Sequence, residues 1–303
     1  MLLLWFIIFI CALFILIKGA DFFTEAAEKV GLHFGLSHFV VGVTIVAFGT
    51  SLPELASSIV AVLSNTSEIV VGNVLGSNIA NILLVLGLTG VISRGFIIKR
   101  HHLKKDLAIL SLSAIILAVF LMDGQFSVIE AGLSLLFLVI YVMFNLNEKV
   151  KEKKHKMALD KWVFPTLLLS GVAIYFGAKY TVDALIHLAT ALNIPAVVLS
   201  ASAVALGTSL PEVVVSVTAA KKGNAEMAVG NILGSNVFNT FAVMGIPALI
   251  GSLVIPASML TLALPVMLFA TLMFVYICYD KKVTVWESIV LLIIYSIFIF
   301  ALF

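Results

Sequence analysis

Two glutamates are the residues of this chain best placed to do chemistry. Glu54 ends the segment AFGTSLPE at residues 47–54, and Glu212 ends the segment ALGTSLPE at residues 205–212. Both lie near the middle of long apolar stretches of membrane-spanning length. An ionisable side chain at that depth costs at least about 2.5–3.5 kcal/mol. Two such acids in matching contexts need a common reason, and a bound cation supplies one.

A proline precedes each acid, at Pro53 and Pro211. Proline has no N–H to offer to the carbonyl four residues earlier, and its ring pushes that carbonyl aside. The affected residues are Gly49 and Gly207. We therefore expect broken helices at the bilayer midplane, with freed carbonyls facing a cavity.

Further oxygen-bearing side chains share helix faces with the acids or lie in two partner segments. Spacings of three or four residues bring such side chains together. They are Thr50, Ser51, Thr208, Ser209, Ser77, Asn81, Ser235 and Asn239. Ca²⁺ prefers six to eight oxygen ligands, whereas soft metals favour Cys or His, which these segments lack. The alternative is a pair of kinked helices whose Ser and Thr bond their own backbone, which leaves both acids unpaired. We expect Asn73 and Asn231 to cap or brace helix starts.

The composition indicates a membrane protein. Of 303 residues, 62% are hydrophobic and 11% charged, far from the balance of a soluble domain. Segments of spanning length run over 2–20, 38–63, 69–92, 105–121, 127–145, 162–187, 196–220, 227–250, 259–279 and 284–302. The expected fold is therefore all-α, with ten transmembrane helices.

Lysine and arginine cluster in alternate loops, which predicts the orientation. The loops between spans three and four, five and six, seven and eight, and nine and ten are basic. The positive-inside bias places these loops in the cytoplasm and both termini outside. We expect a multi-pass protein of the plasma (cytoplasmic) membrane. Residues 146–161, which include EKVKEKKHK, are expected to be a solvated cytoplasmic linker.

The two halves of the chain repeat each other. GNVLGSNIAN at residues 72–81 returns as GNILGSNVFN at residues 230–239, with the same offset of 158 residues that relates the two GTSLPE motifs. Five spans per copy make the second copy enter the membrane from the opposite side. We therefore expect inverted repeats at 1–145 and 162–303, with the site at their interface.

The doubled GTSLPE and GNxxGSNxxN motifs resemble the alpha repeats of the Ca²⁺/cation antiporters, in the prokaryotic-type Na⁺/Ca²⁺ exchanger branch. The resemblance covers all ten spans. It implies secondary active, alternating-access exchange of Na⁺ for Ca²⁺, and a H⁺- or K⁺-coupled cation exchanger of the same superfamily is the alternative. A cation channel and an intramembrane enzyme are rivals from other classes, but no nucleophile–base pair or HExxH motif lies in the spans.

The resemblance also implies a use for each residue. Glu54 and Glu212 would bind the central ions, and Thr50 and Thr208 would add oxygens. Ser51, Ser77 and the Ala47 carbonyl would form one Na⁺ position, while Ser209, Ser235 and the Ala205 carbonyl would form another. Asn81 and Asn239 would line the middle.

Asn239 departs from relatives that carry an aspartate there. Two carboxylates neutralise one Ca²⁺ but leave one positive charge with three Na⁺, so we expect electrogenic exchange without K⁺ dependence. The expected partners are Ca²⁺, Na⁺ and membrane lipid. We expect no cofactor, catalytic residue or nucleic-acid partner, and a monomer to suffice for transport.

Overall fold

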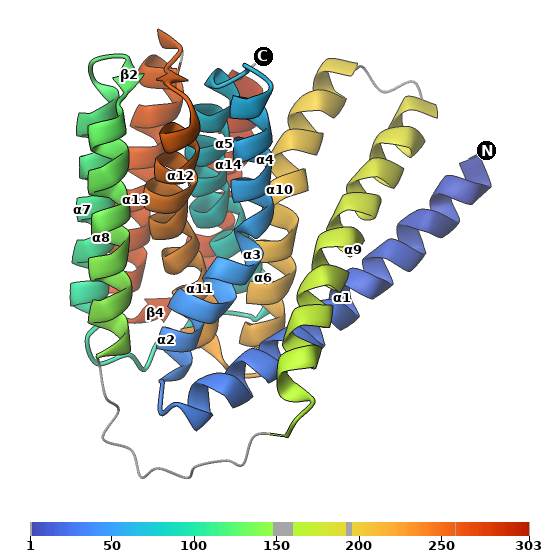
Figure 1. Ribbon diagram of the computed structural model, residues 1–303. Helices are drawn as coiled ribbons and strands as arrows, with labels where there is room; N and C mark the ends of the chain where they lie inside the picture. The colour runs from blue at the N-terminus through green and yellow to red at the C-terminus, as the bar shows by residue number, and fades with distance from the viewer. Residues whose placement is uncertain (1, 148–159, 192–195, 258, 303) are drawn as a thin grey trace.

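The computed structural model is a bundle of long helices with one outlying helix pair (Figure 1). It describes residues 2–147, 160–191, 196–257 and 259–302, and the side chains of 185, 189 and 196–208 are not described. Most of the predicted basic linker therefore lies outside the described residues. The expected all-α character is confirmed, since within these described ranges the strands are four two-residue segments.

The first half of the chain folds into eight helical segments, two π-helical segments and two short strands. They are α1 (Leu2–His33), α2 (His38–Val41), η1 (Gly42–Val46), α3 (Ala47–Thr50), α4 (Leu52–Leu63), α5 (Glu68–Ala80), η2 (Asn81–Leu86), α6 (Gly87–Ile92), β1 (Phe96–Ile97), α7 (Leu103–Leu121), β2 (Gln125–Phe126) and α8 (Val128–Leu146).

The second half follows a similar order. Its elements are α9 (Val163–Ala191), α10 (Ala196–Lys221), α11 (Ala225–Phe238), η3 (Asn239–Val243), α12 (Met244–Ile250), β3 (Leu253–Val254), η4 (Met259–Ala263), α13 (Leu264–Tyr279), β4 (Lys282–Val283) and α14 (Val285–Ala301). The helical runs follow the apolar segments read from the sequence.

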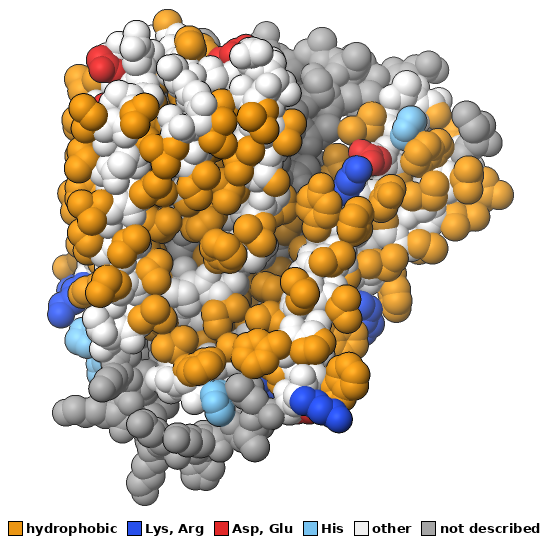
Figure 2. Space-filling model, in the orientation of Figure 1, with side chains coloured by type: hydrophobic (Ala, Val, Ile, Leu, Met, Phe, Trp, Pro, Cys, Tyr) orange, Lys and Arg blue, Asp and Glu red, His pale blue; other side chains and the backbone are white. Residues whose placement is uncertain are grey.

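Several of these helices are long and apolar enough to cross a membrane. Six pass by length and composition within the described residues, and His38–Thr50 with Leu52–Leu63 forms a seventh candidate bent by 40°. α14 is a shorter apolar helix. Figure 2 shows hydrophobic side chains covering most of the height of one face. Such an apolar outer surface suits lipid as the surrounding solvent.

The predicted helix break is present at the first motif only. Ser51 leaves helical geometry with φ −89° and ψ 5°, and Pro53 then lies in the first turn of α4, where its missing N–H costs little. α10 instead runs unbroken from Ala196 to Lys221 with Pro211 inside it. The prediction of a break at the second motif was therefore wrong. A proline removes one intrahelical bond, and neighbouring helices in a bundle can keep such a helix continuous.

Two tiny antiparallel sheets join the halves, one at each end of the bundle (Figure 1). β1 pairs with β4 through Phe96 and Val283, and β2 pairs with β3 through Phe126 and Leu253. An offset of 157 residues relates β1 to β3 and β2 to β4, and the paired residues of the first sheet correspond to the paired residues of the second. This offset is one residue shorter than the 158 residues that relate the motifs, so the chain between motif and strand differs in length by one residue between the copies.

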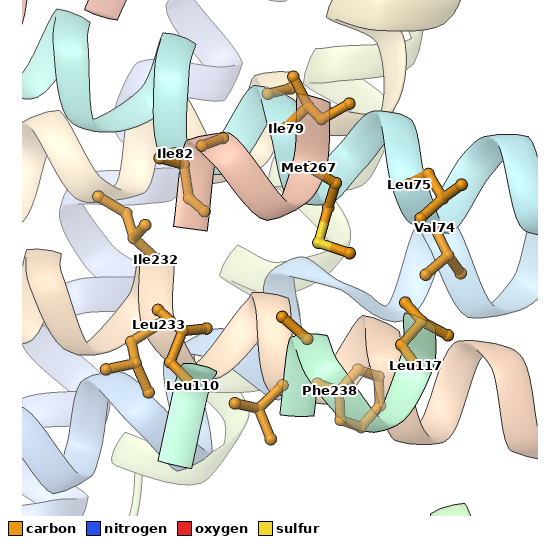
Figure 3. Packing of buried hydrophobic residues seen from close by; sticks show 14 of the residues in the cluster. Val74, Leu75, Ile79, Ile82, Leu110, Leu117, Ile232, Leu233, Phe238 and Met267 are labelled. Atoms are coloured by element: carbon orange, nitrogen blue, oxygen red, sulfur yellow. The ribbon is translucent and has the colours of Figure 1, made fainter. Parts of the chain in front are cut away.

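The core packs helices of both halves together. In Figure 3, Val74, Leu75 and Ile79 of α5 and Ile82 of η2 lie with side chains from α7, α11 and α13. The labelled partners are Leu110, Leu117, Ile232, Leu233, Phe238 and Met267. This apolar packing holds α5 and α11, which carry the GNxxGSNxxN motifs, in the centre of the bundle.

α1 and α9 form a pair that leans away from the bundle (Figure 1). They cross at two glycines, because a Cβ at Gly177 would lie 2.8 Å from the Leu16 nitrogen and one at Gly19 would lie 3.2 Å from the Ile174 nitrogen. Gly19 and Gly177 are equivalent positions in the two copies. Small residues at a crossing allow close backbone approach in membrane helices, so the two helices pack chiefly on each other.

Candidate cation site

The two acids lie in the middle of the bundle, on facing halves. Glu54 stands in the first turn of α4 and Glu212 in α10, and their exposed fractions are 1% and 0%. The Ser51 hydroxyl donates a hydrogen bond to Glu212 Oε1 at 3.3 Å. The two GTSLPE motifs, far apart in sequence, are therefore in direct contact.

Thr50 connects the first motif to α11 of the other half. Its hydroxyl donates to Asn231 Oδ1 at 3.2 Å and lies 3.5 Å from the Ser235 hydroxyl. A hydroxyl has one proton and two lone pairs, so Thr50 can keep this bond and still offer an oxygen to a cation. Of the predicted ligands, Thr50, Ser51, Glu212 and Ser235 are thus linked by these contacts.

Asn73 and Asn231 brace the site in matching ways. The Asn73 amide donates to the Ser58 hydroxyl at 3.0 Å, and the Asn231 amide donates to the Ser216 hydroxyl at 2.9 Å. Asn73 also donates to the Glu54 carbonyl at 3.1 Å. Both lie inside helices α5 and α11 rather than at their starts, so they fasten each motif helix to its neighbour instead of capping it.

Buried polar atoms without a hydrogen-bond partner among the described residues concentrate here. Seven of thirteen belong to predicted ligands, and five of those are oxygens. The oxygens are Glu54 Oε2, Glu212 Oε2, Ser209 Oγ, Asn81 Oδ1 and Asn239 Oδ1. An unsatisfied buried polar group costs about 1–3 kcal/mol. These oxygens come from both halves, and oxygen is the ligand type that a hard cation prefers.

The remaining predicted ligands are not linked to the two acids by the contacts described above. The Ala47 carbonyl accepts the Ser51 N–H at 3.1 Å, so it is not released from the helix as expected. Ser77 lies with its hydroxyl 3.5 Å from Asn73 Oδ1. Thr208 and Ala205 have side chains outside the described part of the chain.

Two π-helical segments begin at the predicted ligands Asn81 and Asn239, which are equivalent in the two copies. A π-turn widens the helix and is often found at functional sites. It leaves carbonyls of the preceding turn with altered partners beside the asparagines. Sequence reasoning missed these turns, and the only signal for them was the repeated asparagine itself.

Close backbone contact holds α11 against the first motif's helix. A Cβ on Gly230 would lie 2.5 Å from the Phe39 carbonyl, and one on Gly234 would lie 2.5 Å from the Val43 carbonyl. A Cβ on Gly42 would likewise meet the Met227 carbonyl. Any side chain at these positions would push the helices apart, so the glycines of GNxxGSN set the distance between Thr50 and its partners on α11.

A cavity of about 1030 Å³ lies beside the site. Gly49, Thr50, Pro53 and Pro211 form part of its wall, and apolar side chains of α8 and α9 form most of the rest. Open space therefore reaches the backbone of both motifs from the side of the outlying α1–α9 pair. A movement of that pair would change access to the acids.

Within the described ranges, no three His, Cys, Asp or Glu residues are placed together so that they could hold a metal ion. The candidate site offers two carboxylates surrounded by hydroxyls and amides. Such a weakly charged oxygen cage suits ions that must be released again rather than held permanently.

Comparison with known proteins places the chain in a family. It matches the family described as "Sodium/calcium exchanger protein" over residues 4–147 and 162–303. It is 35% identical to the sodium/calcium exchanger MaX1 of Methanosarcina acetivorans, over 98% of each chain. It is 36% identical to an uncharacterized membrane protein of Methanocaldococcus jannaschii, over 97% of this chain and 96% of that one.

A solved structure agrees with the sequence comparison. The sodium-calcium exchanger NCX_Mj, soaked with Na⁺ and Sr²⁺, superposes with a TM-score of 0.86 at 32% identity, over 98% of each chain. The family is one of transporters, so this chain is not an enzyme. The doubled motifs, the helical architecture and these matches agree: the chain is a multi-pass membrane protein that belongs to the sodium/calcium exchanger family.

Proposed function

We propose that this protein exchanges Na⁺ for Ca²⁺ across the membrane by alternating access, at a site between Glu54 and Glu212. The observation that carries the proposal is the set of five partnerless buried oxygens contributed by both halves. The contact of Ser51 with Glu212 supports a single shared site. Membership of a family of sodium/calcium exchangers supports the choice of ions.

Each predicted ligand has a role in this proposal. Glu54 and Glu212 bind the central ion, with hydroxyl oxygens beside them and the two π-turn asparagines lining the middle. The supporting ligands are Thr50, Thr208, Ser51, Ser209, Ser77, Ser235, Asn81, Asn239 and the carbonyls of Ala47 and Ala205. Na⁺ and Ca²⁺ compete for the same carboxylates, so one set must leave before the other binds.

The architecture that we propose has ten transmembrane helices in two inverted five-helix repeats, 1–145 and 162–303, joined by a basic linker at 146–161. The two equivalent sheets at opposite ends of the bundle support the inversion. The basic loops then lie in the cytoplasm and both termini outside, in the plasma membrane. A monomer contains every ligand and suffices for transport.

The proposed exchange is electrogenic. Two carboxylates neutralise one Ca²⁺ and leave one positive charge with three Na⁺. Each charge moved is worth about 2.3 kcal/mol per 100 mV. Asn239 adds no third carboxylate, which favours exchange that does not depend on K⁺.

Purified protein in Na⁺-loaded liposomes tests the proposal. An outward Na⁺ gradient should drive ⁴⁵Ca²⁺ uptake with or without K⁺, and a K⁺–valinomycin clamp should change the rate. Ca²⁺ uptake that does not depend on the Na⁺ gradient would refute Na⁺ coupling. A Ca²⁺ uptake rate that does not change with the clamped membrane potential would refute only the electrogenic part of the proposal.

A further inference from the structure

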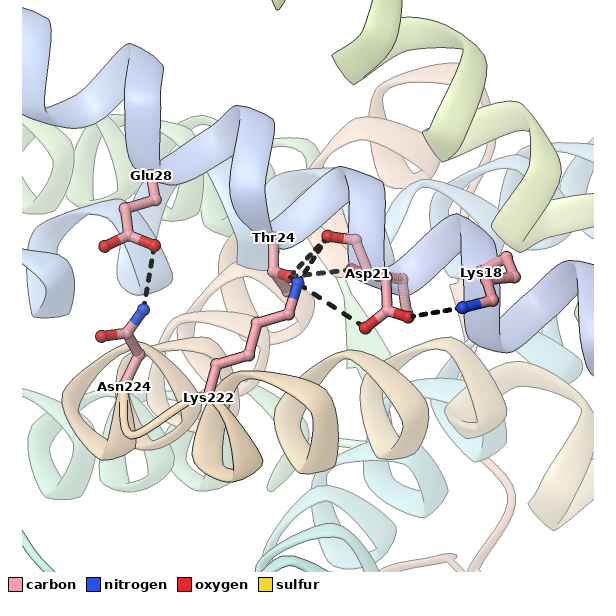
Figure 4. Close-up of polar contacts among 7 residues, drawn as sticks. Lys18, Asp21, Thr24, Glu28, Lys222 and Asn224 are labelled. Atoms are coloured by element: carbon pink, nitrogen blue, oxygen red, sulfur yellow. Dashed lines mark hydrogen bonds and ion pairs between the residues drawn. The ribbon is translucent and has the colours of Figure 1, made fainter. Parts of the chain in front are cut away.

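Polar side chains tie one end of α1 to the turn between α10 and α11 (Figure 4). The Lys222 ammonium donates to the Asp21 carbonyl at 2.8 Å and to the Thr24 hydroxyl at 3.3 Å, and lies 3.6 Å from Asp21 Oδ1. Lys18 lies 3.7 Å from the other carboxylate oxygen of Asp21. These contacts fix α1 against the bundle beyond its apolar stretch.

Glu28 ties the same end of α1 to two further elements. Its Oε2 accepts the Asn224 amide at 3.0 Å, and its Oε1 lies 2.7 Å from His38 Nε2 at the start of α2. Glu28 thus joins α1 to both halves of the bundle. We name the contacts of Asp21, Thr24 and Glu28 with Lys222, Asn224 and His38 the α1 latch.

The equivalent turn in the first copy has the same backbone but different chemistry. Gly223 has φ +84° and Asn65 has φ +57°, so both turns use the left-handed region. The N–H of Asn224 and that of Thr66 each bond a carbonyl five residues earlier at 2.9 Å. The turns therefore have equal shapes, and only their side chains differ.

The partners of the latch are absent from the second copy at every position. Under the 158-residue offset, Asp21, Thr24, Glu28, His38, Lys222 and Asn224 correspond to Lys179, Val182, Ile186, Ala196, Ser64 and Thr66. The pair Lys179 and Ser64 cannot form an ion pair, and Ile186 cannot accept a hydrogen bond. The opposite face therefore cannot build this set of contacts.

The far end of α1 has a different kind of contact. Trp5 stacks on His187 of α9 with ring centroids 3.8 Å apart. That contact holds α1 to its outlying partner rather than to the bundle, so it can move with the pair. The latch instead anchors the pair to the bundle at the end where the loops are basic.

We infer that the α1 latch favours the conformation closed on the cytoplasmic side, and so sets unequal ion affinities on the two sides of an otherwise symmetric transporter. The inference rests on the proposed function. Lys222, Asp21 and Glu28 are positioning residues, since none of them belongs to the cation site. Breaking the latch shifts the population toward the conformation open to the cytoplasm, and apparent affinity follows the fraction of protein that is competent to bind from each side.

The test measures the Ca²⁺ concentration dependence from each side, in right-side-out and inverted vesicles from expressing cells. In Lys222→Met the hydrocarbon stem remains and the charge is lost. The half-saturating Ca²⁺ should fall on the cytoplasmic side and rise on the outer side. The product of the two fold-changes should be about two- to five-fold, as expected for a partly exposed ion pair in a two-state equilibrium. Glu28→Gln should shift both values in the same directions.

Lys221→Met is the matched control, because Lys221 is exposed at the end of α10 beside the latch. It should leave both values unchanged. The double variant Asp21→Lys with Lys222→Asp restores the ion pair and should return both values toward wild type. Equal changes on the two sides, or none, in Lys222→Met and Glu28→Gln would overturn the latch. Wild-type vesicles without Na⁺-driven Ca²⁺ flux would instead refute the proposed function.

Discussion

The two halves are alike at the asparagines of their GNxxGSNxxN motifs, whereas the turns that precede these motif helices differ. Inside, Asn73 bonds Ser58 at 3.0 Å as Asn231 bonds Ser216 at 2.9 Å, and π-turns start at Asn81 and Asn239. At the ends, only one turn carries the lysine and asparagine that hold α1. These proposed ligands and their supports are therefore shared between the copies, while the proposed preference for one conformation has to come from the positions where the copies differ.

The largest effect is expected at the two acids, where the halves should behave alike. Glu54→Gln and Glu212→Gln each keep size and remove the charge that a cation needs, so Na⁺-driven ⁴⁵Ca²⁺ uptake should fall to the level of empty liposomes. Glu25→Gln is the control, because Glu25 is an exposed acid paired with Lys29 at 2.7 Å. Normal uptake in either motif variant would remove that acid from the site.

The next effect concerns the close contact of α11 with the first motif. In Gly234→Ala the new Cβ would lie 2.5 Å from the Val43 carbonyl and 2.7 Å from the Ala47 Cβ. Such overpacking costs about 1–3 kcal/mol, so the midpoint of thermal unfolding in detergent should fall. Gly132→Ala in α8 meets no described atom within 4 Å and should not lower it. Equal midpoints for the two variants would contradict the close approach.

A smaller difference between the halves is expected at Asn73 and Asn231, the asparagines that bond Ser58 and Ser216. Asn73→Ala and Asn231→Ala each leave a buried serine without its hydrogen-bond donor, and each should lower stability by about 1–3 kcal/mol. Asn231 also accepts the Thr50 hydroxyl, so Asn231→Ala should in addition weaken the apparent Ca²⁺ affinity more than Asn73→Ala does. Isothermal titration with Ca²⁺ measures this difference, and equal affinities would mean that Thr50 does not depend on Asn231.

The smallest effect is expected where one half has a polar contact and the other has none. The Asn78 amide donates to the Thr240 hydroxyl at 3.2 Å, and the position equivalent to Thr240 is Ile82. Thr240→Val keeps the shape and removes the acceptor, which should cost about 1 kcal/mol. Chemical denaturation should reveal a lower midpoint, while an unchanged midpoint would mean that Asn78 finds another partner.

The helical fold and the contact between the two GTSLPE motifs could be predicted because the motifs are duplicated. An acid repeated inside an apolar stretch has few explanations, and helical spacing gathers its neighbours. The unbroken course of α10 could not be predicted, since Pro211 allows either a kink or a break and the surrounding helices decide. The π-turns at Asn81 and Asn239 were hidden because no residue type specifies them. The α1 latch was hidden because most of its contacts join segments about 200 residues apart.

The two small sheets have a consequence for how the protein holds together. Each one joins a strand of the first half to a strand of the second, in the same register. The halves are thus joined by backbone hydrogen bonds at both ends of the bundle, so two separately synthesised halves should reassemble without the linker.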